Sequence, residues 1–387
     1  MHRQAMKVGL IVPGFSSDAD DWCIPVLVDV VRELSRRAEV HVFALRYPDR
    51  QDGYGLHGAQ VHTLGGGETR GAARTRLLAA ACARVMAEHR RGPFFVLHGL
   101  WADEPAFVSV TTARLLRIPA FASVMGGELV GMPDIGYGGR LVASNRLLTT
   151  VALRGADRVT AGSSPLVELV RHSMPAARSS RVVRLPWGID PQLFATHGPT
   201  LKLAGESRVL HVGSLVPIKD HATLLRSIAR LKRIVPGVHL HLVGDGPLRS
   251  NLRAEAEALG LGSAVTFHGH VARHELASYY RSADVVAVSS RHEAQLVVAL
   301  EAALCGTPVV GTAVGLVSDF ASPAAPAAPV GDDKALAGSI QAALQPEIGR
   351  ALGEAACRLV RSDYLAAQTA DKLIAMYRNH STTYRAA

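Results

Sequence analysis

Short apolar runs alternate with segments of helical periodicity along most of the chain. Apolar runs of this length are typical of strands in a parallel sheet, and the amphipathic segments between them are typical of crossover helices. The first half predicts strands at Lys7–Val12, Val40–Leu45, Phe94–His98, Ala120–Val124, Arg158–Ala161 and Val182–Leu185. The second half predicts strands at Val209–Val212, His239–Val243, Ala264–Phe267, Val285–Val288 and Val309–Val310, with helices such as Ala222–Ile234 and Arg249–Leu259. The pattern predicts an α/β protein.

The two series of elements predict two doubly wound Rossmann-like domains, residues 1–195 and 196–362, joined through a polar, Pro/Gly-containing stretch. Ligands of such sheets bind outside the carboxyl ends of the strands, so we expect the site in a central cleft that the two domains face. An amphipathic segment within 363–387 closes the chain, and its pattern alone does not say where it packs.

Composition supports this picture. A chain of 387 residues exceeds what one hydrophobic core usually holds, and 48% apolar residues exclude disorder. The net charge of +9 indicates an anionic partner: a nucleotide, a phospholipid or a nucleic acid. Nucleic acid is disfavoured because aromatic residues make up only 5% and do not interleave with basic ones.

The cysteines and the hydrophobic runs indicate a cytoplasmic protein. Cys23, Cys82, Cys305 and Cys357 form no CxxC pair, which is typical of a reducing compartment. The N-terminus has no apolar stretch long enough for a signal peptide. The span 70–91 holds six arginines on an amphipathic pattern, so peripheral contact with the inner membrane face stays open beside a solvated helix face.

The segment Ser289–Gly315 carries the strongest functional signal. It places Glu293 and Glu301 eight positions apart around the start of an apolar helix. Helix N-termini offer free N–H groups and a partial positive charge, which suit a phosphate or a sugar hydroxyl. Eight residues of helix span roughly 12 Å, too far for a glycosidase pair, so the two carboxylates are better interpreted as contacts to two parts of one long ligand.

A second signal follows the first strand of the second half. Gly213 at the strand end allows close backbone approach to a ligand, and Lys219 supplies a positive charge just before a helix. A solvated turn is the alternative for this segment alone. The nearby sequence Val243-Gly-Asp-Gly-Pro247 is only a partial dinucleotide fingerprint, because its last glycine is Arg249, and it is interpreted as a tight turn.

Together these residues resemble the family 4 glycosyltransferases, which retain anomeric configuration and have the two-domain GT-B fold. The similarity is densest from Val209 to Gly315. The shared motifs occur in the family's order: Gly213…Lys219, Gly244-Asp-Gly-Pro247, Phe267-x-Gly269, Tyr280-x-x-Ala283-Asp284, and Glu293-x7-Glu301 through Gly306-x-Pro308. The first half is less similar, and the family's closing helix, which crosses back to the first domain, has its counterpart near 363–387.

The resemblance implies a role for each matched position. Lys219 would neutralise the donor diphosphate, Glu293 would contact the donor sugar, and Glu301 would hold the ribose hydroxyls. The remaining donor-binding positions that it implies are Gly14, Gly213, Ser214, His270, Val271, Leu296, Val297 and Val298.

At three places the sequence differs from the residues that many family members have, and these differences bear on which donor binds rather than on the class of reaction. Ser214 stands where many members have an arginine, and Met125 where many have a histidine. Ala294-Gln295-Leu296 replaces a Gly-Phe-Gly, which indicates a reshaped sugar pocket.

We therefore expect a retaining, metal-independent transferase that moves a sugar from a nucleotide-diphosphate donor to a sugar, lipid-linked or small-molecule acceptor. No cofactor is expected, and the acidic loop Asp18–Asp21, which resembles a DxD metal motif, is interpreted as solvated. The alternatives are a non-catalytic nucleotide-sugar-binding protein, a nucleotide-sugar epimerase and, less favoured, a dinucleotide oxidoreductase.

Overall fold

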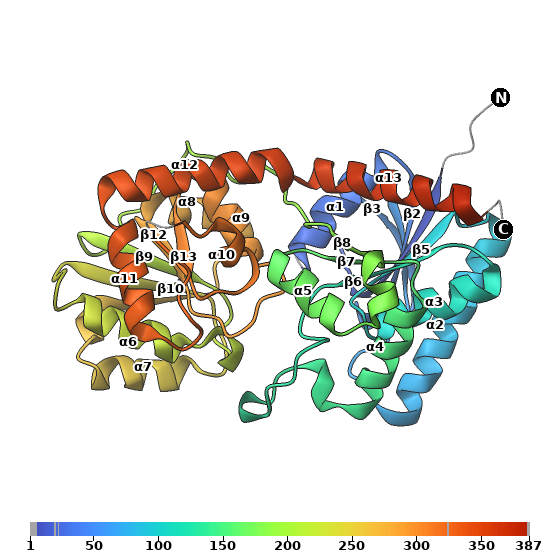
Figure 1. Cartoon of the computed structure of the whole chain (residues 1–387), viewed down its shortest axis with the longest axis horizontal. Helices are drawn as coiled ribbons and strands as arrows, with labels where there is room; N and C mark the ends of the chain where they lie inside the picture. Colours follow the sequence, from blue (N-terminus) through green and yellow to red (C-terminus); the bar gives the residue numbers. More distant parts are fainter. Residues whose placement is uncertain (1–5, 19–20, 22, 323–324, 385–387) are drawn as a thin grey trace. The chain divides into compact units, whose positions relative to one another are not determined.

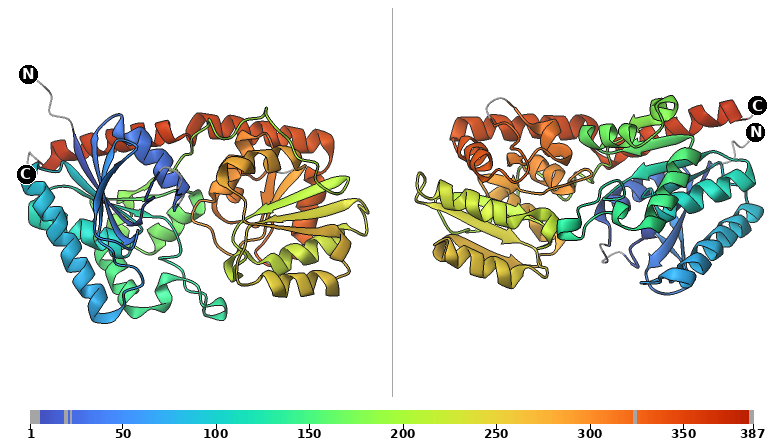
Figure 2. Two further views of the ribbon diagram at one scale, coloured as in Figure 1. Left: turned by 180° about the vertical axis from the view of Figure 1, so that it is seen from behind. Right: turned by 60° about the horizontal axis from the view of Figure 1, so that its bottom comes forward.

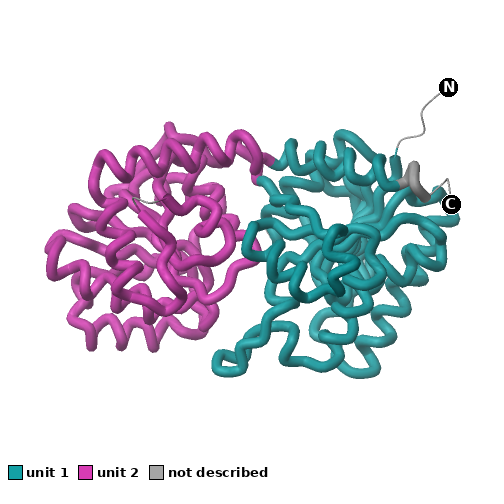
Figure 3. The backbone as a smooth tube through the Cα atoms, in the orientation of Figure 1, with its two compact units in different colours: residues 1–188, 366–387 teal, residues 189–365 magenta. Residues whose placement is uncertain are grey.

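The computed structural model describes residues 6–18, 21, 23–322 and 325–384. The chain forms two compact units, residues 1–188 with 366–387 (unit 1) and residues 189–365 (unit 2) (Figure 3). The divisions lie a few residues from the expected domain ends at 195 and 362. Each unit contains a mainly parallel sheet with helices on both faces (Figures 1 and 2), which confirms the α/β class with two Rossmann-like domains.

Unit 1 is built on a sheet with the strand order β3-β4-β2-β1-β5-β6-β7-β8. Its strands are β1 (Lys7–Gly14), β2 (Glu39–Tyr47), β3 (Gly53–Leu56), β4 (Ala59–Thr63), β5 (Val96–Leu100), β6 (Ala120–Val124), β7 (Arg158–Ala161) and β8 (Val182–Arg184). Its helices are α1 (Pro25–Ser35), α2 (Gly71–Arg91), α3 (Glu104–Leu116), α4 (Ala143–Gly155), α5 (Ser164–His172) and α13 (Ala366–Tyr384). Helices α1 and α13 cover one face of the sheet, and α2, α3 and α4 cover the other (Figure 1).

The hairpin of β3 and β4 departs from the expected parallel arrangement. The two strands pair antiparallel, while β4 pairs parallel with β2. A two-residue turn joins them, with His57 and Gly58 at φ values of 50° and 84°. Two successive positive φ values define the turn type that matches the twist of a hairpin. Neither strand was predicted from the sequence, because glycines and polar residues interrupt the apolar pattern of both.

Unit 2 has the strand order β11-β10-β9-β12-β13, with all neighbours parallel. Its strands are β9 (Ser207–Val212), β10 (Val238–Val243), β11 (Val265–Gly269), β12 (Val285–Val288) and β13 (Val309–Gly311). Its helices are α6 (His221–Leu231), α7 (Arg249–Ala258), α8 (Arg273–Ser282), α9 (Val297–Leu304), α10 (Gly315–Phe320), α11 (Asp333–Ala343) and α12 (Pro346–Asp363). One face is covered by α6, α7 and α11, and the other by α8, α9 and α12 (Figure 1).

The closing helix α13 belongs to unit 1, where it packs against α1. Tyr377 is fully buried, and its hydroxyl lies 2.7 Å from Nδ1 of His98 on β5. Thr369 donates to the carbonyl of Pro186 and accepts from the N–H of Gly188. These bonds attach α13 to unit 1 at the point where the chain leaves that unit. The last three residues of the predicted segment 363–387 lie outside the described residues.

Candidate functional site

The carboxyl ends of β9 and β12 form the topological switch point of unit 2. The two strands are neighbours, and the chain continues from β9 toward β10 and β11 on one side, while β13 lies beyond β12 on the other. At such a point the connections leave in opposite directions and a ligand finds room between them. Their loops are tied together, because the N–H of Arg291 donates to the carbonyl of Ile218 at 2.8 Å.

Lys219 and Glu293 meet at this switch point. Lys219 Nζ lies 2.5 Å from Glu293 Oε1, and the same oxygen accepts a 2.6 Å bond from the Ser290 hydroxyl. The Ser289 hydroxyl holds the Lys219 carbonyl at 2.8 Å. The side chains of Lys219 and Glu293 are 20% and 13% exposed, so the pair is shielded but reachable. The sequence predicted both residues for the site but did not predict that they contact each other.

Lys219 stands directly before α6. Asp220 takes a positive φ of 46° and caps the helix, with its carboxylate accepting from the N–H of Thr223. The N-terminus of α6, with its partial positive charge, thus begins two residues after Lys219. Charge and dipole together favour an anion at this position.

Two buried histidines below Lys219 were missed by the sequence analysis. The rings of His211 on β9 and His221 on α6 meet edge to face at 4.7 Å. Burial, the largest cause, lowers the pKa of His211 to about 4 and that of His221 to about 2, and the nearby Lys219 charge contributes to both values. His211 Nδ1 donates to the Ala287 carbonyl, so its Nε2 keeps a lone pair. Neutral rings leave the positive charge at this edge on Lys219.

The loop before α9 provides backbone donors. Leu296 precedes the helix with a φ of 87°, and the N–H groups of Val297 and Val298 open its first turn. This φ is the left-handed conformation that glycine adopts without strain and a leucine adopts at a cost of about 1–3 kcal/mol. Gly315 packs so closely that a Cβ there would lie 2.6 Å from the Gln295 carbonyl. The strained backbone is therefore fixed by its neighbours, as is common at binding sites.

Glu301 lies deeper than the sequence suggested. It is 5% exposed on α9, where its Oε2 accepts a 2.8 Å bond from the Tyr280 hydroxyl and its Oε1 lies 3.6 Å from Arg273 Nε. Arg273 is 7% exposed and Tyr280 is fully buried, with a pKa raised well above its usual value by burial first and the Glu301 charge second. Glu301 thus joins α8 to α9 through a buried charged cluster.

The other predicted positions of unit 2 surround the same edge. Gly213 is half-buried beside the Lys219 stem, and Ser214 is exposed. His270 and Val271 follow β11 and are exposed and half-buried. Gly244 explains the partial dinucleotide fingerprint, because a Cβ there would lie 2.0 Å from the Gly213 carbonyl. These glycines serve the packing of two loops.

The corresponding edge of unit 1 holds Gly14, Met125 and Glu128. Gly14 ends β1, where a Cβ would lie 3.0 Å from the Tyr47 Cβ. Glu128 is 5% exposed, and its carboxylate accepts the backbone N–H groups of Ala102, Met125 and Gly126 at 3.0, 3.0 and 2.7 Å. Glu128 therefore organises the loop that carries Met125.

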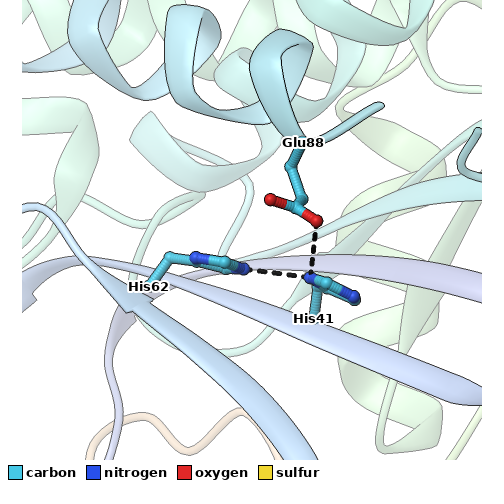
Figure 4. A group of neighbouring side chains, drawn as sticks. All are labelled: His41, His62 and Glu88. Carbon is cyan, nitrogen blue, oxygen red and sulfur yellow. Dashed lines mark hydrogen bonds and ion pairs between the residues drawn. The ribbon is translucent and has the colours of Figure 1, made fainter. Parts of the chain in front are cut away.

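A separate buried cluster in unit 1 has the composition of a metal site (Figure 4). His41 Nδ1 on β2 lies 2.9 Å from His62 Nε2 on β4 and 3.8 Å from Glu88 Oε1 on α2. Glu88 is already paired, with Lys7 at 3.2 Å and Arg91 at 3.0 Å. A divalent cation would have to bind next to the Lys7 ammonium.

The hydrogen bonds of this cluster fix the histidine tautomers. Arg84 lies 3.1 Å from His62 Nδ1 and can only donate, so His62 Nε2 carries the ring proton. His62 then donates to His41 Nδ1, and His41 Nε2 donates to Glu39 at 3.0 Å. Both nitrogens of each ring are used. The arrangement is better explained as a neutral hydrogen-bonded relay than as a metal centre. Within the acidic loop Asp18–Asp21, residues 19 and 20 lie outside the described residues.

These histidines predict that acid destabilises the fold. Burial lowers the pKa of several, which are His62, His211 and His241 at about 4, His98 at about 3 and His221 at about 2. The unfolded chain binds their protons below about pH 6.5 while the native state does not, so stability is complete above that pH and falls as pH drops toward 4. Each such histidine adds a slope of up to about 1.4 kcal/mol per pH unit.

Urea unfolding at pH 7.5, 6 and 5 measures this effect. His62→Gln is expected to reduce the pH dependence of the unfolding free energy by the contribution of about one bound proton. A matched change at the exposed His172 is expected to leave this pH dependence unchanged. A midpoint that does not move between pH 7.5 and 5 would contradict the assignment of neutral buried rings.

Helix α2 carries most of the arginines on which the expected membrane contact depends. Of its arginines, Arg74 pairs with Glu104, Arg84 bonds His62 and Arg91 pairs with Glu88. These three cations have partners inside unit 1, whereas Arg76 and Arg90 are exposed and Arg91 itself is 68% exposed, so α2 keeps a basic surface. Within the described part of the chain, no helix has the length and hydrophobicity that a membrane crossing requires.

Comparison with known proteins identifies the family and the fold of the chain. The sequence profile of the glycosyl transferases group 1 matches residues 196–357. A D-inositol 3-phosphate glycosyltransferase of Mycobacterium sp. (strain JLS) is 30% identical, over 79% of this chain and 73% of that protein. Among solved structures, sucrose-phosphate synthase from Thermosynechococcus elongatus has a TM-score of 0.74 at 21% identity and covers 98% of this chain and 100% of its own. Anabaena HepE in complex with UDP-glucose has a TM-score of 0.72 at 18% identity, covering 97% and 100%.

Proposed function

Since the chain belongs to the glycosyl transferases group 1, as a retaining glycosyltransferase that uses a nucleotide-sugar donor, we propose that unit 2 binds this donor at its β9/β12 switch point. The observation that carries the proposal is the half-buried pair of Lys219 and Glu293 at that edge. When this 2.5 Å ion pair separates, the Lys219 ammonium can bind a diphosphate and the Glu293 carboxylate can accept hydrogen bonds from sugar hydroxyls.

The roles follow from the positions. Lys219 and the N-terminus of α6 stabilise the charge that develops on the departing diphosphate. Glu293, which the Ser290 hydroxyl orients, accepts hydrogen bonds from the donor sugar. The N–H groups of Val297 and Val298 contribute further donors to the same ligand.

The nucleoside part extends toward neighbouring loops. Glu301, on α9 next to the loop that carries Glu293, binds the ribose hydroxyls. His270 and Val271 border the base.

For the substrates, we propose UDP-glucose or a related UDP-hexose as donor and a phosphorylated polyol bound by unit 1 as acceptor. UDP-glucose is the ligand of the HepE structure, and the relative is named for D-inositol 3-phosphate. The net charge of +9 suits an anionic acceptor.

Donor binding is measured by a thermal-shift screen of nucleoside diphosphates and their sugars. A ligand at about 100 times its Kd is expected to add roughly 2.7 kcal/mol to stability, a shift of several degrees. UDP and UDP-glucose are expected to stabilise the protein more than UMP, which lacks the diphosphate that Lys219 binds. Equal shifts with UMP and UDP would remove the diphosphate from this site.

Turnover is then tested with the stabilising donor and inositol phosphates, and the anomeric configuration of the product is read by NMR. Transfer with retention supports the function. Donor stabilisation with neither transfer nor slow donor hydrolysis would instead indicate a nucleotide-sugar-binding protein.

A further inference from the structure

Unit 1 contains a cavity of about 200 Å³ between α4, the loop that leads from β6 to α4, and the residues that follow α5. The wall that α4 contributes consists of residues at the spacing of one helix face, which are Arg146, Thr149, Thr150, Leu153 and Arg154. A water molecule takes about 30 Å³ of liquid, so the cavity has room for a phosphate group and part of the molecule that carries it.

Three arginines line this cavity: Arg140 from the loop, and Arg146 and Arg154 from α4. In the part of the chain that the structure describes, the guanidinium groups of Arg146 and Arg154 have no hydrogen-bond or ion-pair partner. The acidic residue of the lining, Glu128, has its carboxylate bonded to backbone N–H groups. A concave site with unbalanced positive charge attracts an anionic ligand.

Hydrogen bonds hold the cavity open in one shape. Nη2 of Arg140 donates to the Ser173 hydroxyl at 2.7 Å, and this hydroxyl donates to the Leu169 carbonyl at 2.8 Å, at the end of α5. The loop is folded back on itself by a 2.8 Å bond from the Gly139 N–H to the Gly127 carbonyl. A guanidinium has several N–H donors, so Arg140 keeps most of them for a ligand.

A buried hydroxyl in the same wall is also left without a partner. Thr149 is 4% exposed, and its Oγ1 makes no hydrogen bond to any residue that the structure describes. The next residue, Thr150, donates to the Arg146 carbonyl at 2.7 Å, as threonines inside helices commonly do. Because a buried polar group without a partner is costly, such a group in a native protein is often explained by a ligand or a water. An oxygen of an anionic ligand would be a suitable acceptor for it.

We propose that this cavity binds the phosphate group of a ligand of unit 1, through the guanidinium groups of Arg140, Arg146 and Arg154 and the hydroxyl of Thr149. Arginine suits this ligand because its planar N–H groups can bind a pair of phosphate oxygens. The inference rests on the proposed function, since the ligand is identified as the phosphorylated acceptor. The lining residue Glu128 belongs to the loop after β6, at the carboxyl edge of the sheet where such a domain receives its ligand.

A soluble polyol phosphate and the headgroup of a phospholipid present the same phosphate oxygens to the arginines. The lipid source has its own support in Leu141, Val142 and Leu147, which are exposed and adjoin Arg140 and Arg146 in the sequence. Exposed apolar residues beside cations are typical of contact with a membrane surface.

Phosphate binding is measured by thermal shift with inorganic phosphate, D-inositol 3-phosphate and unphosphorylated inositol. Arg146→Gln and Arg154→Gln are each expected to weaken binding of the two phosphates about ten- to hundredfold, the usual loss for a charged hydrogen bond. Arg90→Gln, at an exposed arginine of α2, is the matched control and is expected to bind as the wild type does. Comparing the variants with the wild type removes the nonspecific stabilisation that phosphate gives to proteins. An equal loss in Arg90→Gln would trace the effect to net charge and overturn the proposal.

Cosedimentation with vesicles of phosphatidylcholine and phosphatidylglycerol in equal parts identifies the source of the phosphate. Vesicle binding that both Arg146→Gln and Leu147→Ser weaken assigns the cavity to a lipid headgroup. Binding of D-inositol 3-phosphate that depends on Arg146, without such vesicle binding, assigns it to a soluble ester. If neither soluble phosphates nor vesicles distinguish Arg146→Gln from the wild type, the proposal is overturned.

Thr149→Val tests the hydroxyl without changing the charge. The free protein is expected to be no less stable than the wild type, because the lost hydroxyl has no partner there. Its affinity for the phosphate ligand is expected to fall several-fold. A less stable free protein with unchanged phosphate binding would give this hydroxyl a structural role and remove it from the site.

Donor binding keeps this inference separate from the proposed function. UDP is expected to stabilise Arg146→Gln as much as the wild type, since the donor site lies in unit 2. During transfer to D-inositol 3-phosphate, Arg146→Gln is expected to raise the acceptor KM about ten- to hundredfold and to leave the donor KM unchanged. Transfer by the wild type with an acceptor KM that Arg146→Gln and Arg154→Gln leave unchanged would overturn the cavity as the acceptor site while the proposed function stands.

Discussion

Lys219→Met is expected to lower kcat/KM by about three orders of magnitude while the protein stays folded. Methionine keeps the length of the side chain but removes the ammonium that we place against the donor diphosphate. Loss of one preorganised charge-stabilising donor typically costs about 10²–10³ in rate, and the loss of donor affinity adds to this. Steady-state kinetics with the donor from the thermal-shift screen measures both effects, with kcat falling and donor KM rising.

The stability of this variant separates catalysis from folding. Lys219 and Glu293 are both partly exposed, so removing the ammonium is expected to cost no more than about 1 kcal/mol. Lys202→Met, at an exposed lysine of the same unit, is the matched control and is expected to keep full activity. Glu293→Gln also frees Lys219 from its partner, so it is expected to retain UDP binding while losing transfer. Unchanged kinetics of Lys219→Met would remove this residue from the site.

The central strands of both sheets were predictable because they are buried on both faces and read as continuous apolar runs. β1, β9, β10 and β12 lie within a residue or two of their predicted ends. The β3–β4 hairpin lies at the edge of its sheet, where partial exposure permits the glycines and polar residues that hid it. Strand order was not predictable in the same way, since it depends on pairings between segments far apart in the sequence.

The site, like the fold, has some features that could be predicted from the sequence and others that depend on contacts between distant segments. Lys219 and Glu293 could be assigned to one edge of the sheet from sequence, because each follows a strand and parallel neighbours end at the same edge, but their direct contact could not be predicted. The burial of Glu301 could not be predicted from the sequence, because it depends on contacts with Arg273 and Tyr280 on another helix.

Glu301→Ala is expected to lower the free energy of unfolding by about 3–5 kcal/mol. It leaves the buried Arg273 guanidinium without its carboxylate and takes the hydrogen-bond acceptor from the fully buried Tyr280 hydroxyl. Removing one member of a buried ion pair costs this much because the remaining charge has lost its compensation. Urea unfolding measures the loss, and Glu257→Ala on the exposed side of α7 is the matched control.

Two milder variants separate the structural role of Glu301 from its proposed contact with the ribose. Tyr280→Phe leaves the charge pair with Arg273 in place and is expected to cost about 1–3 kcal/mol of stability with little change in UDP affinity. Glu301→Gln keeps an acceptor for Tyr280 but removes the charge, and a lost charged hydrogen bond to the ribose is expected to weaken UDP binding about ten- to hundredfold. If Glu301→Gln bound UDP as tightly as the wild type, Glu301 would hold α8 against α9 and would not contact the donor.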